Sequence, residues 1–171
     1  MEKWDLYDEN GNKLGKTINR GEKMEPNEYH ISVHIWIINK NNEFLIQKRS
    51  PNKKKFPNMW SMTGGAVLAG ENSEQACIRE AKEELGVELS YNDIKKIGTI
   101  KRENGLVDIW IAYKDFDEKC LKLQIDEVSE AKWANISKIE KLLEEKRFTP
   151  SVVQGLELCT TYLSNQNKNE I

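Results

Sequence analysis

The segment Gly65 to Val87, GAVLAGENSEQACIREAKEELGV, constrains the fold of this chain more than any other. Its centre predicts a helix, because Asn72 or Ser73 can cap the start and Gly86 can end it. With Asn72 as the cap, Gln75 stands three residues later, where a capping box requires a glutamine or glutamate. The segment therefore predicts one helix with a defined start and a defined end.

This helix has an acidic face beside an apolar face. At about 100° per residue, one arc of roughly 100° holds three carboxylates: Glu80, Glu83 and Glu84. A separate arc is apolar and must face the core; it holds Cys77, Ile78, Ala81 and Leu85. Like charges at these spacings repel, and only Arg79 and Lys82 lie nearby to offset them. By itself such a face is typical of a solvated helix, but a divalent cation would turn the repulsion into ligation.

The donor types in the segment select among metals. Carboxylate oxygens on a rigid helix suit Mg²⁺ or Mn²⁺, which keep several waters and bind beside substrate phosphates. The segment has no histidine, and its one cysteine, Cys77, is on the apolar face, so zinc is not expected. Mg²⁺ is therefore the expected cofactor, with Mn²⁺ as a substitute.

The composition excludes several classes of protein. Hydrophobic residues make up 38% of the chain and charged residues 32%, which is typical of a soluble globular protein. The longest apolar run, Ile35 to Ile38, is too short to cross a membrane, and residues 1–7 lack an apolar signal core. A net charge of −2 offers no basic surface for duplex nucleic acid. Three widely spaced cysteines without a CxxC pair indicate neither a disulfide framework nor a zinc site, so we expect a cytoplasmic protein.

The remaining sequence predicts an α/β fold in which a mixed sheet lies between helices. A β-hairpin is expected first. The strands expected after it are Tyr29–Asn39, Glu43–Lys48, Lys96–Lys101, Val107–Tyr113 and Ala131–Ala134. The expected C-terminal helices are Ser137–Lys146 and Ser151–Ser164. No repeat or linker divides the chain, so residues 1–171 are expected to form one domain. Residues 1–28 then form a hairpin extension, and the polar residues 165–171 are expected to be frayed.

The helix segment resembles the signature of Nudix (MutT-type) hydrolases, G-x5-E-x7-R-E-U-x-E-E-x-G-U, in which U is a bulky aliphatic residue. Eight fixed positions are in register: Gly65, Glu71, Arg79, Glu80, Glu83, Glu84, Gly86 and Val87. The one departure is Ala81 at the first U position, where a small apolar residue can still pack. Residues 65–87 are therefore identified as a Nudix box, and a match of this length is far more specific than a short motif.

The resemblance implies a Nudix-type α/β/α sandwich and the hydrolysis of a nucleoside diphosphate linked to another moiety. It implies three metal-binding carboxylates, with the carbonyl of Gly65 as a further candidate ligand: Glu80, Glu83 and Glu84. Glu71, at the helix entrance, would support the site. Arg79 would orient a glutamate through charge-assisted hydrogen bonds, without touching the substrate.

The residue that activates the attacking water is left open at this point. Nudix families place the general base differently, and two candidates lie within the box, Glu80 and Glu83. Later elements supply three more carboxylates that could face the box: Asp108, Asp126 and Glu127.

A cationic loop precedes the box. Arg49, Lys53 and Lys54 lie between a predicted strand and Gly65, where they could meet the phosphates of a substrate. We therefore expect them to bind substrate, whereas Lys55 is equally well explained as a solubilising lysine.

The order of Trp4, His30, Arg49 and Trp60 also resembles the Nudix branch that includes the isopentenyl-diphosphate isomerases. Those isomerases have a catalytic cysteine just before the box and a metal-binding histidine just inside it. This chain has Gly64 and Ala66 at those places: it resembles the isomerases without their catalytic residues.

Hydrolysis of a nucleotide-type diphosphate is therefore the expected function. An isomerase and a non-catalytic nucleotide-binding module remain as alternatives. RNA trimming is disfavoured by the absence of a basic stripe interleaved with aromatic residues. The substrate is a small molecule that the sequence does not specify, no membrane partner is expected, and the N-terminal hairpin could support a homodimer.

Overall fold

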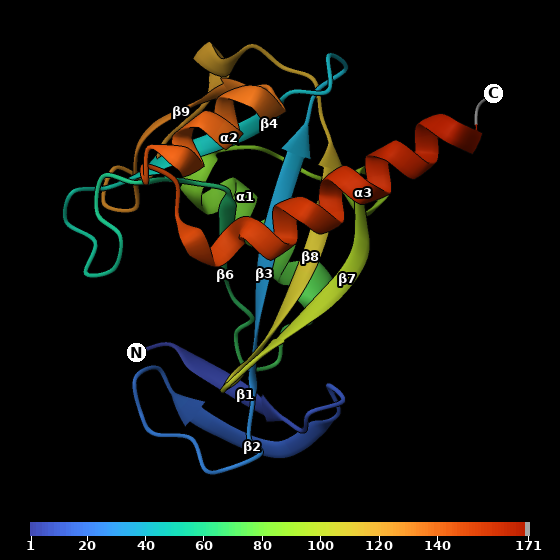
Figure 1. Ribbon diagram of the computed structural model, residues 1–171. Coiled ribbons are helices and arrows are strands. Elements are labelled where there is room, and N and C mark those ends of the chain that lie inside the picture. Colours follow the sequence, from blue (N-terminus) through green and yellow to red (C-terminus); the bar gives the residue numbers. More distant parts are fainter. Residues whose placement is uncertain (170–171) are drawn as a thin grey trace.

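The computed structural model describes residues 1–169 and shows a mixed β-sheet between helices (Figure 1). The sheet has the strand order β5-β4-β3-β8-β7, with β6 paired to β3 and β9 paired to β4. Its strands are β3 (His30–Ile38), β4 (Phe44–Arg49), β5 (Trp60–Ser61), β6 (Thr63–Ala66), β7 (Ile94–Arg102), β8 (Gly105–Tyr113) and β9 (Val128–Ala134). The central pair β3 and β8 is parallel, and the other pairs are antiparallel.

Helices cover both faces of this sheet, which confirms the predicted α/β/α sandwich (Figure 1). The helices are α1 (Ser73–Leu85), α2 (Ile136–Glu144) and α3 (Val153–Asn169), and short 3-10 turns span Tyr91–Asp93, Glu118–Cys120 and Pro150–Val152. Helix α1 packs on one face, whereas α2 and α3 pack on the other. No helix within residues 1–169 is long and apolar enough to cross a membrane.

Strand β3 lies between two hydrophobic cores. Successive side chains of a strand point to opposite faces, so Val33, Ile35 and Ile37 pack against α1. Trp36 and Ile38 point the other way and pack with α2 and α3. Because it is covered on both sides, this strand is almost continuously apolar at its C-terminal end, as the sequence predicted.

The two antiparallel partners of β3 diverge along its length. Residues 32–35 of β3 pair with β6, whereas Ile38 pairs with Phe44 of β4. Strands β4 and β6 are not paired with each other. The sheet therefore opens between them, on the side where α1 lies.

The N-terminal hairpin is present and forms its own two-stranded sheet of β1 (Lys3–Tyr7) and β2 (Lys13–Asn19), at the bottom of Figure 1. It joins the rest of the chain by backbone hydrogen bonds of 2.8 and 2.9 Å between Tyr7 and Tyr29. The ring of Trp4 also stacks on that of His30, with ring centroids 4.4 Å apart.

Some boundaries differ from the sequence prediction. Strands β5 and β6 were not predicted, because they are short and β6 contains two glycines. Helix α3 runs to Asn169, so the prediction of a frayed segment was wrong for residues 165–169; residues 170–171 lie outside the described residues. Helix α3 continues past residue 164 because no proline or glycine follows Gly155, and polar residues by themselves do not end a helix.

Helix α1 has the predicted boundaries. The side chain of Asn72 accepts a hydrogen bond from the backbone of Gln75, and the Gln75 side chain accepts one from the backbone of Asn72. Gly86 ends the helix in the left-handed region, with a φ of 69°. A Cβ at position 86 would lie 2.7 Å from the Cβ of Lys122, so the glycine also permits a close approach.

We predict that Gly86→Ala destabilises the protein more than Gly15→Ala. Both glycines have a φ of 69°, but nothing lies within 4 Å of a Cβ at position 15. The left-handed conformation costs roughly 1–2 kcal/mol in either variant. Contact with Lys122 adds roughly 1–3 kcal/mol of overpacking at position 86 alone. Urea unfolding measures both losses, and equal losses would contradict the close approach.

Candidate active site

The site is built where α1 crosses the opening between β4 and β6. Glu80 lies against the backbone of Gly65, because a Cβ at that position would collide with the Glu80 carboxylate. Gly64 is equally restricted, since a Cβ there would collide with the carbonyl oxygen of Val33. The two glycines therefore let the acidic face of α1 approach the strand backbone directly.

Glu84 fills the opening itself. Its side chain accepts hydrogen bonds from Nε2 of Gln47 on β4, at 2.9 Å, and from the backbone N–H of Gly64 on β6, at 3.3 Å. The residue is only 7% exposed. Burial and, to a smaller extent, the negative charge of Glu80 raise the pKa of Glu84 to about 8. Both of its hydrogen-bond donors are neutral amides, so no cationic group balances this carboxylate.

Arg79 connects the other carboxylates. Its guanidinium donates to both oxygens of Glu71, at 2.9 and 3.0 Å, and to the carbonyl of Ala66, at 2.9 Å. One nitrogen, Nη1, also donates to Glu80 at 2.7 Å and to Glu83 at 3.0 Å. Burial raises the pKa of Glu80, and Arg79 opposes that rise. The sequence prediction gave Arg79 one glutamate to orient; the structure gives it three.

The donor set fits a hard divalent cation. Within residues 1–169 no three acidic, histidine or cysteine side chains converge closely enough to hold an ion as they stand, and Arg79 is bonded to two of the candidates. However, Glu84 is a buried carboxylate, Glu80 is half-buried beside it, and the charge of Glu80 raises the pKa of Glu84. Within residues 1–169 Glu84 forms no ion pair with a lysine or arginine. Uncompensated buried charge of this kind is costly unless a cation balances it. The backbone of Gly65 lies directly against Glu80.

The cationic loop is partly engaged with the protein itself. Lys53 forms an ion pair with Glu127, and Nε of Arg49 donates to the carbonyl of Lys55 at 3.1 Å. Lys54 and Lys55 are exposed. Glu127 contributes to the electrostatic field at Glu84, so the Lys53 pair lies close to the carboxylates.

The three acidic residues named outside the box lie in different settings. Asp108 is buried and bonded to Thr99 and Lys96, both at 2.7 Å. Asp126 is exposed, and Glu127 faces the site with its lysine partner. Among these three, Glu127 is the one whose charge raises the pKa of Glu84.

Sequence reasoning missed two residues of the site. Gln47 is 2% exposed and bonds both Glu84 and the carbonyl of Met62. A polar residue directly after the apolar run 44–46 was the available signal. Asp5 is the second: it accepts a hydrogen bond from the backbone of Gly70 at 2.9 Å, across 65 positions of sequence. No local pattern could have revealed that contact.

The hairpin therefore holds the loop that enters α1. Besides the Asp5 contact, the backbone N–H of Ala69 donates to the carbonyl of Lys3 at 2.8 Å. Lys13 pairs with Asp5 at 2.6 Å and neutralises its charge. This loop carries Glu71, so the N-terminal strand helps to set the position of the Arg79 partner.

The cysteines lie away from the carboxylates. Cys77 and Cys159 are fully buried in the two cores, and burial raises the pKa of the Cys77 thiol to about 12. Cys120 lies in a 3-10 turn between β8 and β9. Gly64 and Ala66, both on β6, occupy the positions at which the resemblance places the catalytic cysteine and the histidine of the isomerases. None of the three cysteines replaces that catalytic group.

Comparison with known proteins agrees with this fold. The NUDIX domain family matches residues 28–154. An uncharacterised Nudix hydrolase of Listeria monocytogenes is 38% identical, over 88% of this chain and 89% of the relative. A crystal structure of a Deinococcus radiodurans protein superimposes with a TM-score of 0.71 at 24% identity, covering 86% of this chain and 92% of that one.

More distant relatives carry named activities. A prenyl-diphosphate phosphatase of Methanosarcina mazei is 25% identical, over 84% of this chain and 90% of the relative. An isopentenyl-diphosphate Delta-isomerase of Citrobacter koseri is 28% identical, over 81% of this chain and 80% of the relative. The isomerase-like proteins are thus a related branch, as the sequence predicted.

A mixed sheet between helices, with an acidic helix packed on glycines, defines a Nudix-fold protein. The chain belongs to the Nudix family and is related to its hydrolases. Residues 1–27, which form the hairpin, lie outside the match to the family.

We predict that Asp5→Ala loosens the loop before α1. Losing a hydrogen bond to a charged group costs about 1.5–3 kcal/mol, so amide exchange at Gly70 should rise roughly tenfold or more. Hydrogen exchange followed by NMR measures this change. Glu9→Ala is the matched control, because Glu9 belongs to the same hairpin but pairs with Lys101. Unchanged exchange at Gly70 in the Asp5 variant would rule out the tether.

Proposed function

We propose that this protein is a Mg²⁺-dependent hydrolase of a phosphoanhydride bond in a nucleoside diphosphate linked to another moiety. The observation that carries the proposal is the buried carboxylate of Glu84 beside the half-buried carboxylate of Glu80, both set against Gly64 and Gly65, with only neutral amides bonded to Glu84. Family membership supports hydrolysis, and the intact box supports a metal-dependent reaction. Mn²⁺ is the expected substitute ion.

The proposed metal-binding groups are the carbonyl of Gly65 and three carboxylates: Glu80, Glu83 and Glu84. The bound ion would polarise phosphoryl oxygens and neutralise the leaving group. Arg79 orients Glu80 and Glu83 and keeps Glu71 in place, so that the carboxylate oxygens stay fixed during turnover. Arg79 thus acts through the glutamates and does not touch the substrate.

The attacking water needs a base with access to solvent. Glu83 has a side chain that is 54% exposed, whereas the Glu80 side chain is 14% exposed. We therefore propose Glu83 as the group that accepts the proton from water, with Glu80 as the second candidate. Arg79 bonds one oxygen of Glu83 and leaves the other free to face the water.

The cationic loop is the proposed site for the substrate phosphates. Lys54 is exposed, Lys53 is paired with Glu127 next to the carboxylates, and Arg49 has further guanidinium nitrogens beside the one bonded to Lys55. A diphosphate would add negative charge between this loop and α1. Lysine and arginine side chains at that point would balance it.

Two observations disfavour isomerase activity. Gly64 and Ala66 supply neither a catalytic thiol nor a metal-binding imidazole, and the buried Cys77 is on the core side of α1. The distant relative that is a prenyl-diphosphate phosphatase keeps prenyl diphosphates in the range of substrates to be tested. Hydrolysis is the reaction proposed in either case.

We further propose that the chain works as one domain with its hairpin extension, in the cytoplasm. The three cysteines are free, which suits a reducing compartment. The exposed strand β2 is the surface that would support a homodimer. Small molecules, and neither membranes nor duplex nucleic acid, are the proposed partners.

We predict that Glu83→Gln and Glu84→Gln each lower phosphate or pyrophosphate release at least 100-fold. Glu88→Gln is the matched control. Glu88 is an exposed glutamate just after the end of α1 and pairs with Lys82, so this variant should keep full activity. A substrate panel of dinucleotide and sugar-nucleotide diphosphates, with isopentenyl diphosphate, provides the assay. Full activity in both glutamine variants would contradict the assignment of Glu83 and Glu84 to the metal site.

Mg²⁺ should also stabilise the folded protein, because a ligand bound to the native state alone shifts unfolding by mass action. At an Mg²⁺ concentration 100 times its Kd, the stabilisation is about 2.7 kcal/mol. Glu84→Gln should abolish this stabilisation without loss of stability in the metal-free protein, since it removes a buried charge. Thermal unfolding with Mg²⁺ and with a chelator measures both effects. Equal stabilisation of the wild type and the variant contradicts metal binding at Glu84.

A further inference from the structure

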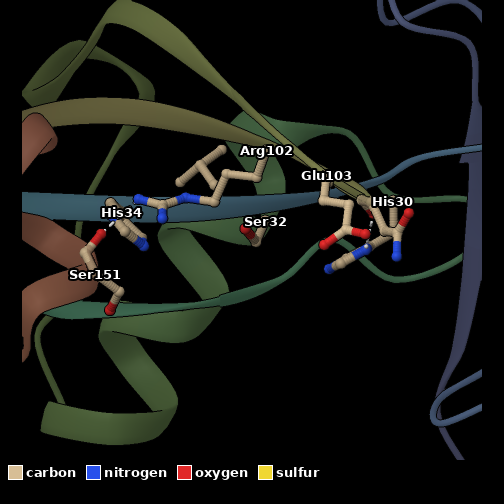
Figure 2. Close-up of a pocket in the computed structure, with 9 residues that line it drawn as sticks. His30, Ser32, His34, Arg102, Glu103 and Ser151 are labelled. Atoms are coloured by element: carbon tan, nitrogen blue, oxygen red, sulfur yellow. Dashed lines mark hydrogen bonds between the residues drawn. The ribbon is translucent and has the colours of Figure 1, made fainter.

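A second pocket lies on the other face of the sheet from α1. It has a volume of about 390 Å³ and is formed by β3, by the end of β7 and the start of β8 with the turn between them, and by the 3-10 turn Pro150–Val152 that precedes α3. His30, Ser32 and His34 project into it from one face of β3 (Figure 2). We call it the histidine pocket, because both histidines of the chain line it.

One end of the histidine pocket is cationic. Arg102 extends along the pocket toward His34 and Ser151 (Figure 2). One of its guanidinium nitrogens, Nη2, donates to the carbonyl of Ser151 at 2.5 Å. That bond holds the side chain in place and leaves other guanidinium N–H groups facing the pocket, where the fork can bind two oxygens at once.

His34 lies beside this arginine with an unused ring nitrogen. Its Nδ1 is buried and has no hydrogen-bond partner in the described part of the chain. The first turn of α3 packs close to this nitrogen, since a Cβ at Gly155 would lie 3.7 Å from it. Burial and the charge of Arg102 lower the pKa of His34 to about 4, so the ring is neutral at pH 7. A buried polar atom without a partner is costly, so a ligand oxygen that reached this nitrogen would gain a hydrogen bond.

The opposite end of the pocket is fixed by the hairpin. His30 stacks on Trp4, and its Nδ1 lies 3.0 Å from the carbonyl of Asn104. Glu103 lies beside His30 at this end, away from Arg102 (Figure 2). His34 follows His30 by four positions, which corresponds to about 13 Å along a strand. The two ends therefore differ in charge and are far enough apart to contact different groups of one small molecule.

We propose that the histidine pocket binds a small molecule through a phosphate-type oxyanion held by Arg102, His34 and Ser151. A guanidinium fork, a neutral imidazole and a hydroxyl can all donate to oxyanion oxygens. An anion at this end would satisfy the buried nitrogen of His34 and balance the charge of Arg102. A cation is disfavoured there by Arg102, and an apolar group would leave Nδ1 of His34 without a partner.

The oxyanion has two potential sources, a separate phosphate-bearing ligand or a phosphate group of the hydrolysed substrate. The pocket and α1 are on opposite faces of β3, so the proposal stands independently of the metal site. Gly64 pairs directly with His34, however, and its backbone N–H contacts Glu84. The pocket and the carboxylates are thus one strand apart. A single extended substrate could contact both, and the experiment below tests this.

Imidazole NMR provides a direct assay, because every histidine signal of the protein comes from this pocket. The full-length protein is titrated with inorganic phosphate, without metal, and the C–H signals of His30 and His34 are followed. We expect a saturable shift that is larger for His34 than for His30. Arg102→Gln should weaken phosphate binding at least tenfold, and Arg102→Lys should weaken it less. Arg147→Gln, a surface arginine paired with Glu145, is the matched control and should bind as the wild type does.

The outcomes separate the proposal from its alternatives. No saturable His34 shift, or an equal shift in Arg102→Gln, overturns the proposal; the second result would mean that phosphate binds elsewhere. The dispersed His signals report whether each variant is folded, so a variant that loses them is replaced by His34→Gln with the His30 signal as the probe. If phosphate raises the KM of hydrolysis in the wild type but not in Arg102→Gln, the pocket holds a phosphate of the substrate. A saturable shift without an effect on KM identifies a separate ligand.

Discussion

The bonds of Arg79 to three carboxylates are the interaction on which the rest of this site depends. An acidic helix face cannot approach a sheet unless its charge is offset, because removing carboxylates from water costs several kcal/mol each. Arg79 offsets Glu71, Glu80 and Glu83 from within the same segment. Glu84 is outside this network, and its two amide partners do not neutralise it. Arg79 thus compensates three of the four carboxylates, and Glu84 is the one that the proposed metal ion would balance.

The divergence of β4 and β6 from β3 gives this helix its place. Where β3 changes partner, the sheet opens, and Glu84 occupies the opening between Gln47 and Gly64. The absence of a side chain at Gly64 and Gly65 then brings backbone amide and carbonyl groups within reach of α1. A continuous sheet would have paired those groups with a neighbouring strand. The interruption of strand pairing therefore supplies the polar backbone that a phosphate-processing site requires.

Strand β3 joins two regions that the hairpin also contacts. On one face, Gly65 pairs with Val33 beneath α1; on the other, His30 and His34 line the histidine pocket. Strand β1 of the hairpin reaches both regions, through Trp4 at the pocket and Asp5 at the loop before α1. The extension that lies outside the family match is thus positioned to influence metal site and pocket together.

The sequence by itself determined helix α1, with its start, its end and the spacing of its carboxylates. The cap at Asn72, the end at Gly86 and the spacing of the three glutamates depend on contacts within four residues or on helical periodicity, which are local properties. Only the tertiary structure decided that Gln47 contacts Glu84, that Asp5 holds Gly70, and that residues 63–66 form a strand. Those contacts join residues 37 and 65 positions apart, or depend on pairing with β3 rather than on intrinsic propensity. Hydrogen bonds between distant segments leave no periodic trace in the sequence, so the partners of the acidic helix could be found only once the chain had folded around it.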